Sequence, residues 1–203
     1  MTLTAGVIGV QGDVAEHAAA ITRAARAHGE RVNVIEIRRS GLVPDCDLLS
    51  MPGGESTTIS RSLRREDIAP EIRAHVAAGK PLLATCAGLI VAATDAGDER
   101  VSTLDLLDVT VERNAFGRQR DSFETSIGIA GLDEPFPAVF IRAPVITDAG
   151  DTEVLATWDD RPVAVHDGPI VGTSFHPELT DDSRLHGLTF FENPSSEPSP
   201  QSP

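Results

Sequence analysis

Two residues far apart in the sequence have the chemistry of a nucleophile and a base. The candidate nucleophile is Cys86, which follows the apolar segment 81–85 and precedes Ala87-Gly88 at the start of a helix-like segment. Small residues at a sharp strand-to-helix turn are typical of a nucleophile elbow, and a helix N-terminus favours the thiolate. The alternative is a small buried hydrophobic residue, which is what most free cysteines are. The spacing alone leaves the two interpretations about equal.

The candidate base is His176, in the segment Ser-Phe-His-Pro-Glu-Leu. A residue before proline favours an extended backbone, in which alternate side chains share a face. Glu178 is therefore expected beside the imidazole of His176, where a carboxylate fixes the tautomer and raises the basicity. An isolated His-Pro-Glu is more often a turn without a role, so this interpretation depends on the pairing with Cys86. The other five histidines show no comparable spacing.

Two further loops contain glycines after candidate strands: Gln11-Gly12 and Pro52-Gly53-Gly54-Glu55-Ser56. Consecutive glycines at a helix start expose backbone N–H groups that can stabilise a developing oxyanion. The alternative is a plain strand-to-helix turn, and two glycines alone are weak evidence. Cys46, the second cysteine, lies between Asp45 and Asp47, and two carboxylates raise a thiol pKa, so a structural role is expected there.

Other kinds of site are not indicated. The glycines of segment 6–12 have G-x-x-G-x-x-G spacing, which differs from the dinucleotide-binding fingerprint, and the sequence has no Walker-type Gly-Lys-Ser/Thr. No Cys/His cluster has the spacing of a zinc site, so no metal is expected. The formal net charge is −14, from 31 acidic and 17 basic residues, which makes nucleic acid an improbable partner.

The elements that must position these residues alternate between strands and helices in the first half of the chain. Strands are expected at 5–10, 32–37, 47–51 and 81–85, and helices from Asp13 to Gly29, from Ser56 onward and over 67–78. This order predicts a mostly parallel sheet covered on both faces, with active-site loops at the carboxyl ends of its strands. The second half has short strands at 109–112, 138–142, 153–158, 162–166 and 170–174, which predict an antiparallel edge on that sheet.

The chain length and the two cysteines add further expectations. We expect one domain over residues 1–192 and a disordered tail over 193–203, which is polar and rich in proline. No apolar run approaches the roughly 20 residues of a membrane helix, and residues 1–4 lack the features of a secretory signal. Two cysteines make a disulfide framework improbable, so a cytoplasmic protein with free thiols is expected.

With these loops in place, the chain resembles the class I (triad-type) glutamine amidotransferases. It is most similar to the glutaminase subunits of pyridoxal 5'-phosphate synthase, the PdxT/SNO family. The Cys86 and His-Pro-Glu segments are shared by the wider class, whereas the segments around Arg113 and Arg142 are specific to this family. The matching segments, in the family's order, are 9–12, 52–58, 85–90, 111–119, 121–124, 140–144 and 174–180.

The resemblance implies a flavodoxin-like three-layer α/β sandwich that hydrolyses L-glutamine to L-glutamate and ammonia. Cys86 would attack the side-chain amide, His176 would transfer protons and Glu178 would orient His176. Backbone N–H groups of Gly54 and Ala87 would stabilise the oxyanion. The residues that would line the glutamine pocket are Gly54, Glu55, Ser56, Arg113, Ile141 and Arg142. Without the motif context, the two arginines are more simply interpreted as surface ion pairs.

The resemblance also implies a partner and no cofactor. Ammonia would pass to a PdxS/SNZ-type synthase subunit in a hetero-oligomer, and the glutaminase would be poorly active until it docks. Two alternatives stay open: a cysteine peptidase or other hydrolase on a similar fold, and an inactive scaffold subunit. The sequence departs from the family at Ala84, where glycine is usual, and in a curtailed C-terminal helix around Gly187.

Overall fold

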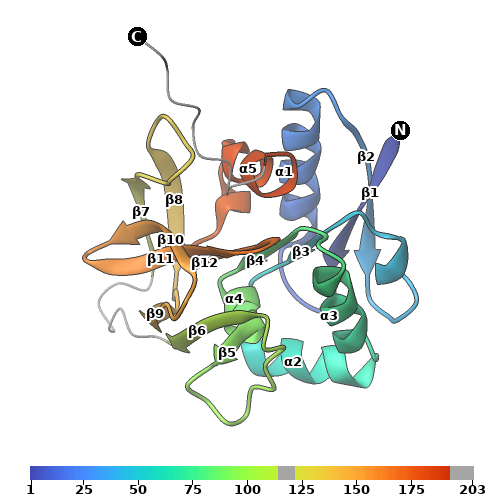
Figure 1. Cartoon of the computed structure of the whole chain (residues 1–203), viewed down its shortest axis with the longest axis horizontal. Coiled ribbons are helices and arrows are strands. Elements are labelled where there is room, and N and C mark those ends of the chain that lie inside the picture. The colour runs from blue at the N-terminus through green and yellow to red at the C-terminus, as the bar shows by residue number, and fades with distance from the viewer. Residues whose placement is uncertain (114–121, 193–203) are drawn as a thin grey trace.

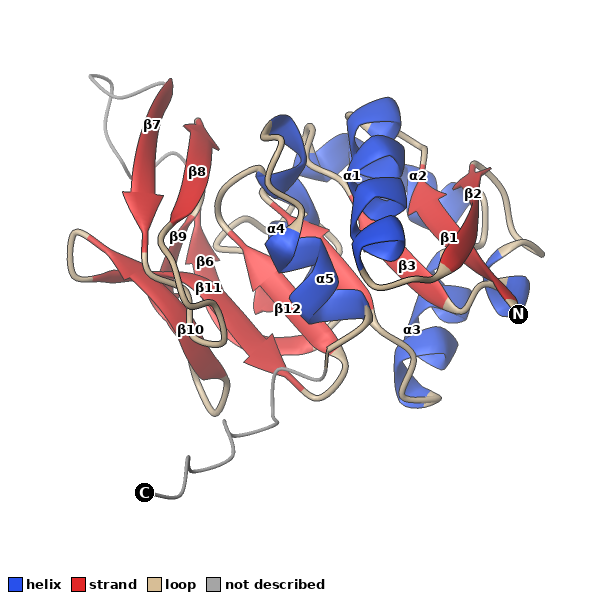
Figure 2. Cartoon of the chain, turned by 90° about the horizontal axis from the view of Figure 1, so that it is seen from above, coloured by secondary structure: helices blue, strands red, loops and turns tan. Residues whose placement is uncertain are grey.

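A central sheet lies between two layers of helices in the computed structural model, which describes residues 1–113 and 122–192 (Figures 1 and 2). The α-helices are α1 (Val14–Ala27), α2 (Ser56–Arg65), α3 (Ala69–Ala77), α4 (Ala87–Ala92) and α5 (Arg184–Phe190), with short 3-10 helices η1 (Val43–Asp45) and η2 (Pro177–Leu179). The strands are β1 (Thr2–Ile8), β2 (Arg31–Ile37), β3 (Leu48–Met51), β4 (Leu82–Thr85), β5 (Ala93–Asp95), β6 (Leu107–Glu112), β7 (Ser122–Ile127), β8 (Phe136–Ile141), β9 (Val145–Asp148), β10 (Glu153–Trp158), β11 (Arg161–Asp167) and β12 (Ile170–Thr173).

The largest sheet has the strand order β10-β11-β12-β4-β3-β1-β2. Its five strands from β12 to β2 run parallel, and their order along the chain is the flavodoxin-like 2-1-3-4-5 arrangement. This confirms the predicted fold class. Thr85 of β4 pairs with Thr173 of β12, so the loops that carry Cys86 and His176 leave the sheet side by side.

Two hydrophobic cores cover the two faces of this sheet. Leu82 and Ala84 of β4 pack in one core with α2, α3 and α4, whereas Leu83 packs in the other with α1 and α5. Alternate residues of a strand point to opposite faces, and both faces are covered, so β3 and β4 are apolar throughout apart from Ser50 and Thr85. Figure 1 shows α1 and α5 on one side of the sheet and α2 and α3 on the other.

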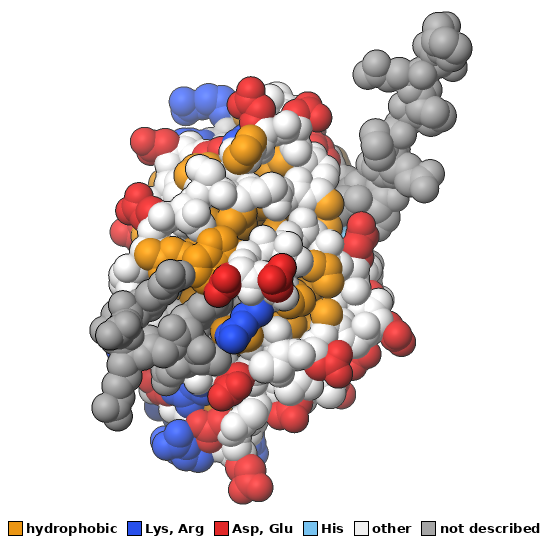
Figure 3. All heavy atoms as spheres, turned by 90° about the vertical axis from the view of Figure 1, so that its left-hand side faces the viewer, with side chains coloured by type: hydrophobic (Ala, Val, Ile, Leu, Met, Phe, Trp, Pro, Cys, Tyr) orange, Lys and Arg blue, Asp and Glu red, His pale blue; other side chains and the backbone are white. Residues whose placement is uncertain are grey.

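The antiparallel part differs from the expectation. Only β10 and β11 extend the large sheet as antiparallel strands, while β5-β6-β9 and β7-β8 form two separate small sheets. The segment 170–174 was expected in the antiparallel edge, but β12 runs parallel to β4 and is the fifth parallel strand. Strands β5, β7 and β9 were not predicted because they are short or half-exposed: β7 alternates exposed and partly buried residues and is completed by pairing with β8. These small sheets build the β-rich end of the molecule, where hydrophobic side chains reach the surface among acidic ones (Figure 3).

The C-terminal helix is short, as expected. Helix α5 ends at Phe190, and its Gly187 admits the ring of His28, the residue after α1, since a Cβ there would lie 2.6 Å from His28 Cε1. The expected tail over 193–203 lies outside the described residues, as do residues 114–121 of the family-specific segment. Within the described ranges, none of the helices has the length and apolar character that crossing a bilayer requires.

Candidate active site

The four loops singled out in the sequence meet at one edge of the sheet, at the carboxyl ends of β1, β3, β4 and β12. They surround a cavity of about 450 Å³. The residues that line it are Gln11, Asp13, Gly54, Glu55, Ser56, Cys86, Ala87, Ile90, Arg113, Ile141, Arg142, Pro144 and His176. The structure thus brings together every predicted site residue except Glu178, which lies behind His176.

Cys86 occupies a strained turn between β4 and α4. Its backbone has φ 51° and ψ −109°, a conformation that an L-residue adopts only when its surroundings enforce it. The Cys86 N–H donates to Thr173 O (2.8 Å), and Gly88 packs so closely that a Cβ there would lie 2.1 Å from Met51 O. The strain falls on Cys86 itself, whereas Ala84 is an ordinary strand residue within β4. Alanine at 84 is therefore compatible with the elbow.

His176 and Glu178 lie as the extended-chain argument expects. His176 Nδ1 is 2.7 Å from Glu178 Oε1, and both residues are buried. Burial opposes the charged imidazole, but hydrogen bonds with Cys86 and Glu178 outweigh it and raise the pKa of His176 to about 10. Burial likewise opposes the carboxylate of Glu178, yet His17 and His176 hold the pKa of this carboxyl well below its usual range. The arrangement therefore favours an imidazolium beside an ionised carboxylate.

The glycine loop, residues 52–55 before α2, packs directly against Cys86 and His176. A Cβ on Gly53 would lie 2.6 Å from His176 Cε1 and 3.3 Å from Cys86 Cβ, so only glycine fits between them. Gly54 has φ +139° and lies against the side chain of Gln11, whose Oε1 accepts from the Glu55 N–H (2.8 Å). The Gln11 loop thus holds the glycine loop in place beside the cavity.

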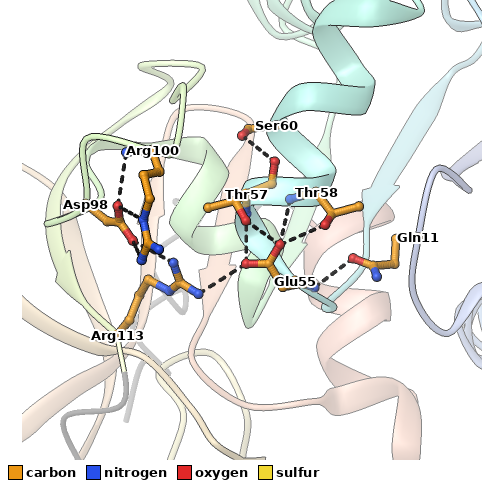
Figure 4. A network of polar contacts seen from close by, with 8 residues as sticks. All are labelled: Gln11, Glu55, Thr57, Thr58, Ser60, Asp98, Arg100 and Arg113. Carbon is orange, nitrogen blue, oxygen red and sulfur yellow. Dashed lines mark hydrogen bonds and ion pairs between the residues drawn. The ribbon is translucent and has the colours of Figure 1, made fainter.

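Glu55 and Arg113 belong to a polar network on one side of the cavity (Figure 4). The Glu55 carboxylate caps α2: it accepts from the hydroxyl of Thr57 and from both the N–H and hydroxyl of Thr58, and these bonds lower its pKa to about 2. Arg113 Nη2 lies 3.2 Å from Glu55 Oε1, and Nη1 lies 2.7 Å from Asp98 Oδ2. Arg113 therefore lines the cavity and also forms the ion pairs that its residue type alone suggested.

Ile141 and Arg142 approach the cavity from the end of β8. Cys86 Sγ lies 3.9 Å from Ile141 O, and the exposed Arg142 has a backbone φ of +42°. Cys46 lies elsewhere, buried near η1, and burial raises the pKa of its thiol to about 11, with the neighbouring carboxylates adding to the effect. This confirms its expected structural character.

One buried histidine of this region, His17, was not predicted from the sequence. His17 Nε2 lies 3.4 Å from Glu178 Oε1, although nothing in its spacing suggested a partner. The available signal was its position: His17, Ala20, Ile21 and Ala24 form the buried stripe of α1, and a histidine in such a stripe requires polar partners. Asp98, which holds Arg113, had no comparable signal.

One group of potential metal ligands lies beside the cavity. Asp13, His176 and Glu178 each place one nitrogen or oxygen within 4.8 Å of the others. Because His176 Nδ1 and Glu178 Oε1 hydrogen bond to each other, these atoms are already engaged, and we assign no metal to them.

Comparisons with known proteins agree with this geometry. Curated relatives named pyridoxal 5'-phosphate synthase subunit PdxT include one from Haloarcula marismortui, 70% identical over 97% of this chain and all of the relative. Another, from Methanothrix thermoacetophila, is 52% identical over 90% of this chain and 96% of the relative.

Solved structures give the same picture. A crystal structure of a glutamine amidotransferase is 42% identical, with a TM-score of 0.81 over 91% of this chain and 96% of that one. The PurLQS structure from Thermotoga maritima, at 17% identity and a TM-score of 0.61 over 93% and 94% of the two chains, shares the fold. The model of the SNO glutamine amidotransferase family matches residues 7–194. The loops that surround Cys86 thus lie within a matched region that spans nearly the whole sequence, and the chain belongs to the SNO glutamine amidotransferase family.

Proposed function

We propose that this protein hydrolyses L-glutamine to L-glutamate and ammonia, and that Cys86, His176 and Glu178 form its catalytic triad. The observation that carries the proposal is that the Cys86 and His176 side chains line one cavity, with Glu178 Oε1 2.7 Å from Nδ1 of the imidazole. A thiolate beside an imidazolium is the arrangement that amide cleavage through a thioester requires.

The reaction has two halves. The Cys86 thiolate attacks the side-chain carbonyl carbon of glutamine, and the oxyanion forms beside the backbone N–H groups of Gly54 and Ala87. His176 donates its proton to the amide nitrogen, the C–N bond breaks, and ammonia leaves a γ-glutamyl thioester. Water then attacks the thioester and gives its proton to His176, the C–S bond breaks, and glutamate departs from a restored thiolate.

The substrate pocket follows from the lining residues. Glutamine has a carboxylate and an ammonium group besides the reacting amide, and Arg113, Arg142 and Glu55 supply charges of both signs around the cavity. Ser56 and Ile141 line the remaining wall. In this assignment Arg113 turns part of its guanidinium from Asp98 or Glu55 to the substrate.

The partner follows from the family. We propose that the ammonia passes to a PdxS/SNZ-type subunit of pyridoxal 5'-phosphate synthase, with which this chain forms a hetero-oligomer for vitamin B6 synthesis. Support comes from the relatives that share 70% of their residues with it and carry that subunit name. We also propose a cytoplasmic location, since both cysteines are free and the nucleophile must stay reduced.

The test is glutamate release from glutamine by the chain together with a synthase subunit, compared with the variant Cys86→Ala. We expect the wild type to release glutamate and the variant to lose at least about a thousandfold in rate while it keeps its fold. Absence of glutamate in the wild-type reaction refutes the proposal. Equal activity of the two proteins excludes Cys86 as the nucleophile.

A further inference from the structure

His17 has a fully buried imidazole whose polar neighbours come from three separate segments. The residue lies in the first turn of α1, with no exposed surface. Its Nδ1 is 2.8 Å from the hydroxyl oxygen of Ser50 in β3, and its Nε2 is 3.3 Å from the hydroxyl oxygen of Thr85 in β4. The same Nε2 is 3.4 Å from Glu178 Oε1. One ring therefore contacts the strand before the glycine loop, the strand before Cys86 and the carboxylate behind His176.

These contacts define the tautomer of His17. An ionised carboxylate only accepts hydrogen bonds, so the nitrogen that faces Glu178 must carry the proton. A neutral ring with Nε2–H then leaves Nδ1 as an acceptor, and the Ser50 hydroxyl donates to it. The opposite tautomer would place a nitrogen lone pair against a carboxylate oxygen in a site without solvent. Of the two neutral tautomers, only the first satisfies both nitrogens of the imidazole.

The environment makes Glu178 dependent on this donor. The side chain of Glu178 has no exposed surface, and its Oε2 has no hydrogen-bond partner within residues 1–113 and 122–192. Titratable side chains near His17 and Glu178 include His186 of α5, whose ring centroid lies 6.0 Å from that of His17, and Asp13, which places a carboxylate oxygen within 4.8 Å of one of Glu178. Burial lowers the pKa of His186 to about 3, so this second imidazole is neutral. In the described part of the chain, the Glu178 carboxylate is thus stabilised by only two imidazoles, those of His176 and His17.

We propose that His17 is a positioning residue for the triad: its Nε2–H holds the buried Glu178 carboxylate ionised and aimed at His176 Nδ1. This inference rests on the glutaminase function proposed above. In metal sites, the groups that orient a ligand typically contribute a factor of about 10 to 100 to affinity or activity, and we expect an effect of similar size here. Ser50 of β3 and Thr85 of β4 bind the same ring. His17 therefore also fixes the position of the Glu178 carboxylate relative to the two strands that precede the glycine loop and Cys86.

The test compares variants that keep or remove the donor. His17→Gln places an amide N–H near the position of Nε2, whereas His17→Leu fills similar space without a donor. His75→Leu is the matched control, since His75 is also a buried helix histidine, bonded to Pro81 O and far from the cavity in α3. The readouts are the pH dependence of kcat/KM for glutamine, measured with the synthase subunit, and the pH dependence of Cys86 alkylation by iodoacetamide.

We expect His17→Leu to lower kcat about 10- to 100-fold with little change in KM. Removing the donor raises the pKa of Glu178, so the carboxylate gains a proton at a higher pH as the solution is acidified. The acid limb of both profiles, where the rate falls at low pH, should therefore lie at least one pH unit higher in His17→Leu than in the wild type. It should lie near its wild-type position in His17→Gln and in His75→Leu.

Two results would overturn the proposal. One is a wild-type pH profile in His17→Leu. The other is a loss of rate without a shift of the acid limb and without recovery in His17→Gln, which identifies packing alone. Alkylation of Cys86 does not require glutamine turnover, so the two proposals can fail separately. If the chain releases no glutamate but its alkylation profile shifts in His17→Leu, the glutaminase function is refuted and the link from His17 to Glu178 is supported.

Discussion

Gly53 lies against the imidazole of His176 so closely that a Cβ on it would stand 2.6 Å from His176 Cε1. The same Cβ would stand 3.3 Å from Cys86 Cβ. The space between the proposed nucleophile and base therefore admits a backbone and no side chain. The glycine loop contributes to the site through its shape as well as through its N–H groups.

Gly53→Ala should displace the imidazole and reduce glutamine hydrolysis about a hundredfold, since a shift of about 1 Å in reacting groups has that effect. The control is Gly128→Ala, because Gly128 is exposed, has no positive φ and has nothing within 4 Å of its added Cβ. Steady-state rates and melting temperatures of both variants test this. Full activity in Gly53→Ala would contradict this prediction, because it would mean that the glycine loop and His176 can move apart without loss of activity.

The activity should decline as the pH rises toward 10. The pKa of His176 is raised to about 10, so the imidazolium that protonates the departing ammonia persists below that pH and is lost above it. Glu178→Gln removes one of the contacts that raise this pKa and leaves the opposing effect of burial, so the basic limb of kcat/KM should move to lower pH by at least one unit. An unchanged basic limb in this variant would assign that titration to another group.

Arg113 should contribute mainly to glutamine binding. Arg113→Ala is expected to raise KM at least tenfold with a smaller change in kcat, because it removes a cation that lines the cavity. Arg100→Ala is the control: Arg100 also pairs with Asp98, but its side chain is 71% exposed and it does not line the cavity. Its KM should stay within about twofold of the wild type. Equal KM values for the two variants would remove Arg113 from the pocket.

The two cysteines should differ sharply in reactivity. Burial raises the pKa of Cys46 to about 11, whereas Cys86 lines the cavity beside an imidazolium. A glutamine-mimicking electrophile at pH 7 should therefore label one site, found by peptide mass mapping at Cys86. Cys46→Ala should label to the same extent as the wild type, and Cys86→Ala should not label. Modification of Cys46 in the folded protein would contradict this.

Much of the architecture could be predicted from the sequence because its signals are local. Apolar runs followed by glycine turns predicted the parallel strands of the first half and the helices between them. Parallel strands place the loops at their carboxyl ends along one edge of the sheet. The loops around Gln11, Gly53 and Cys86 were therefore predicted to share an edge. The strand before His176 was expected in the antiparallel part and joins the parallel strands through its pairing with β4. The strands β5, β7 and β9 were missed because their residues become strands only through pairing with partners distant in the chain.

Residue types and short-range spacing determined which groups can act as nucleophile, base and orienting carboxylate, since the elbow around Cys86 and the alternation of His176 with Glu178 are properties of neighbouring residues. Tertiary packing alone decided that His17 approaches Glu178, that Gly53 fits between Cys86 and His176, and that Arg113 pairs with Asp98. Each of these contacts joins elements whose separation along the chain carries no periodic signal, and each forms only when the helices close onto the two faces of the sheet.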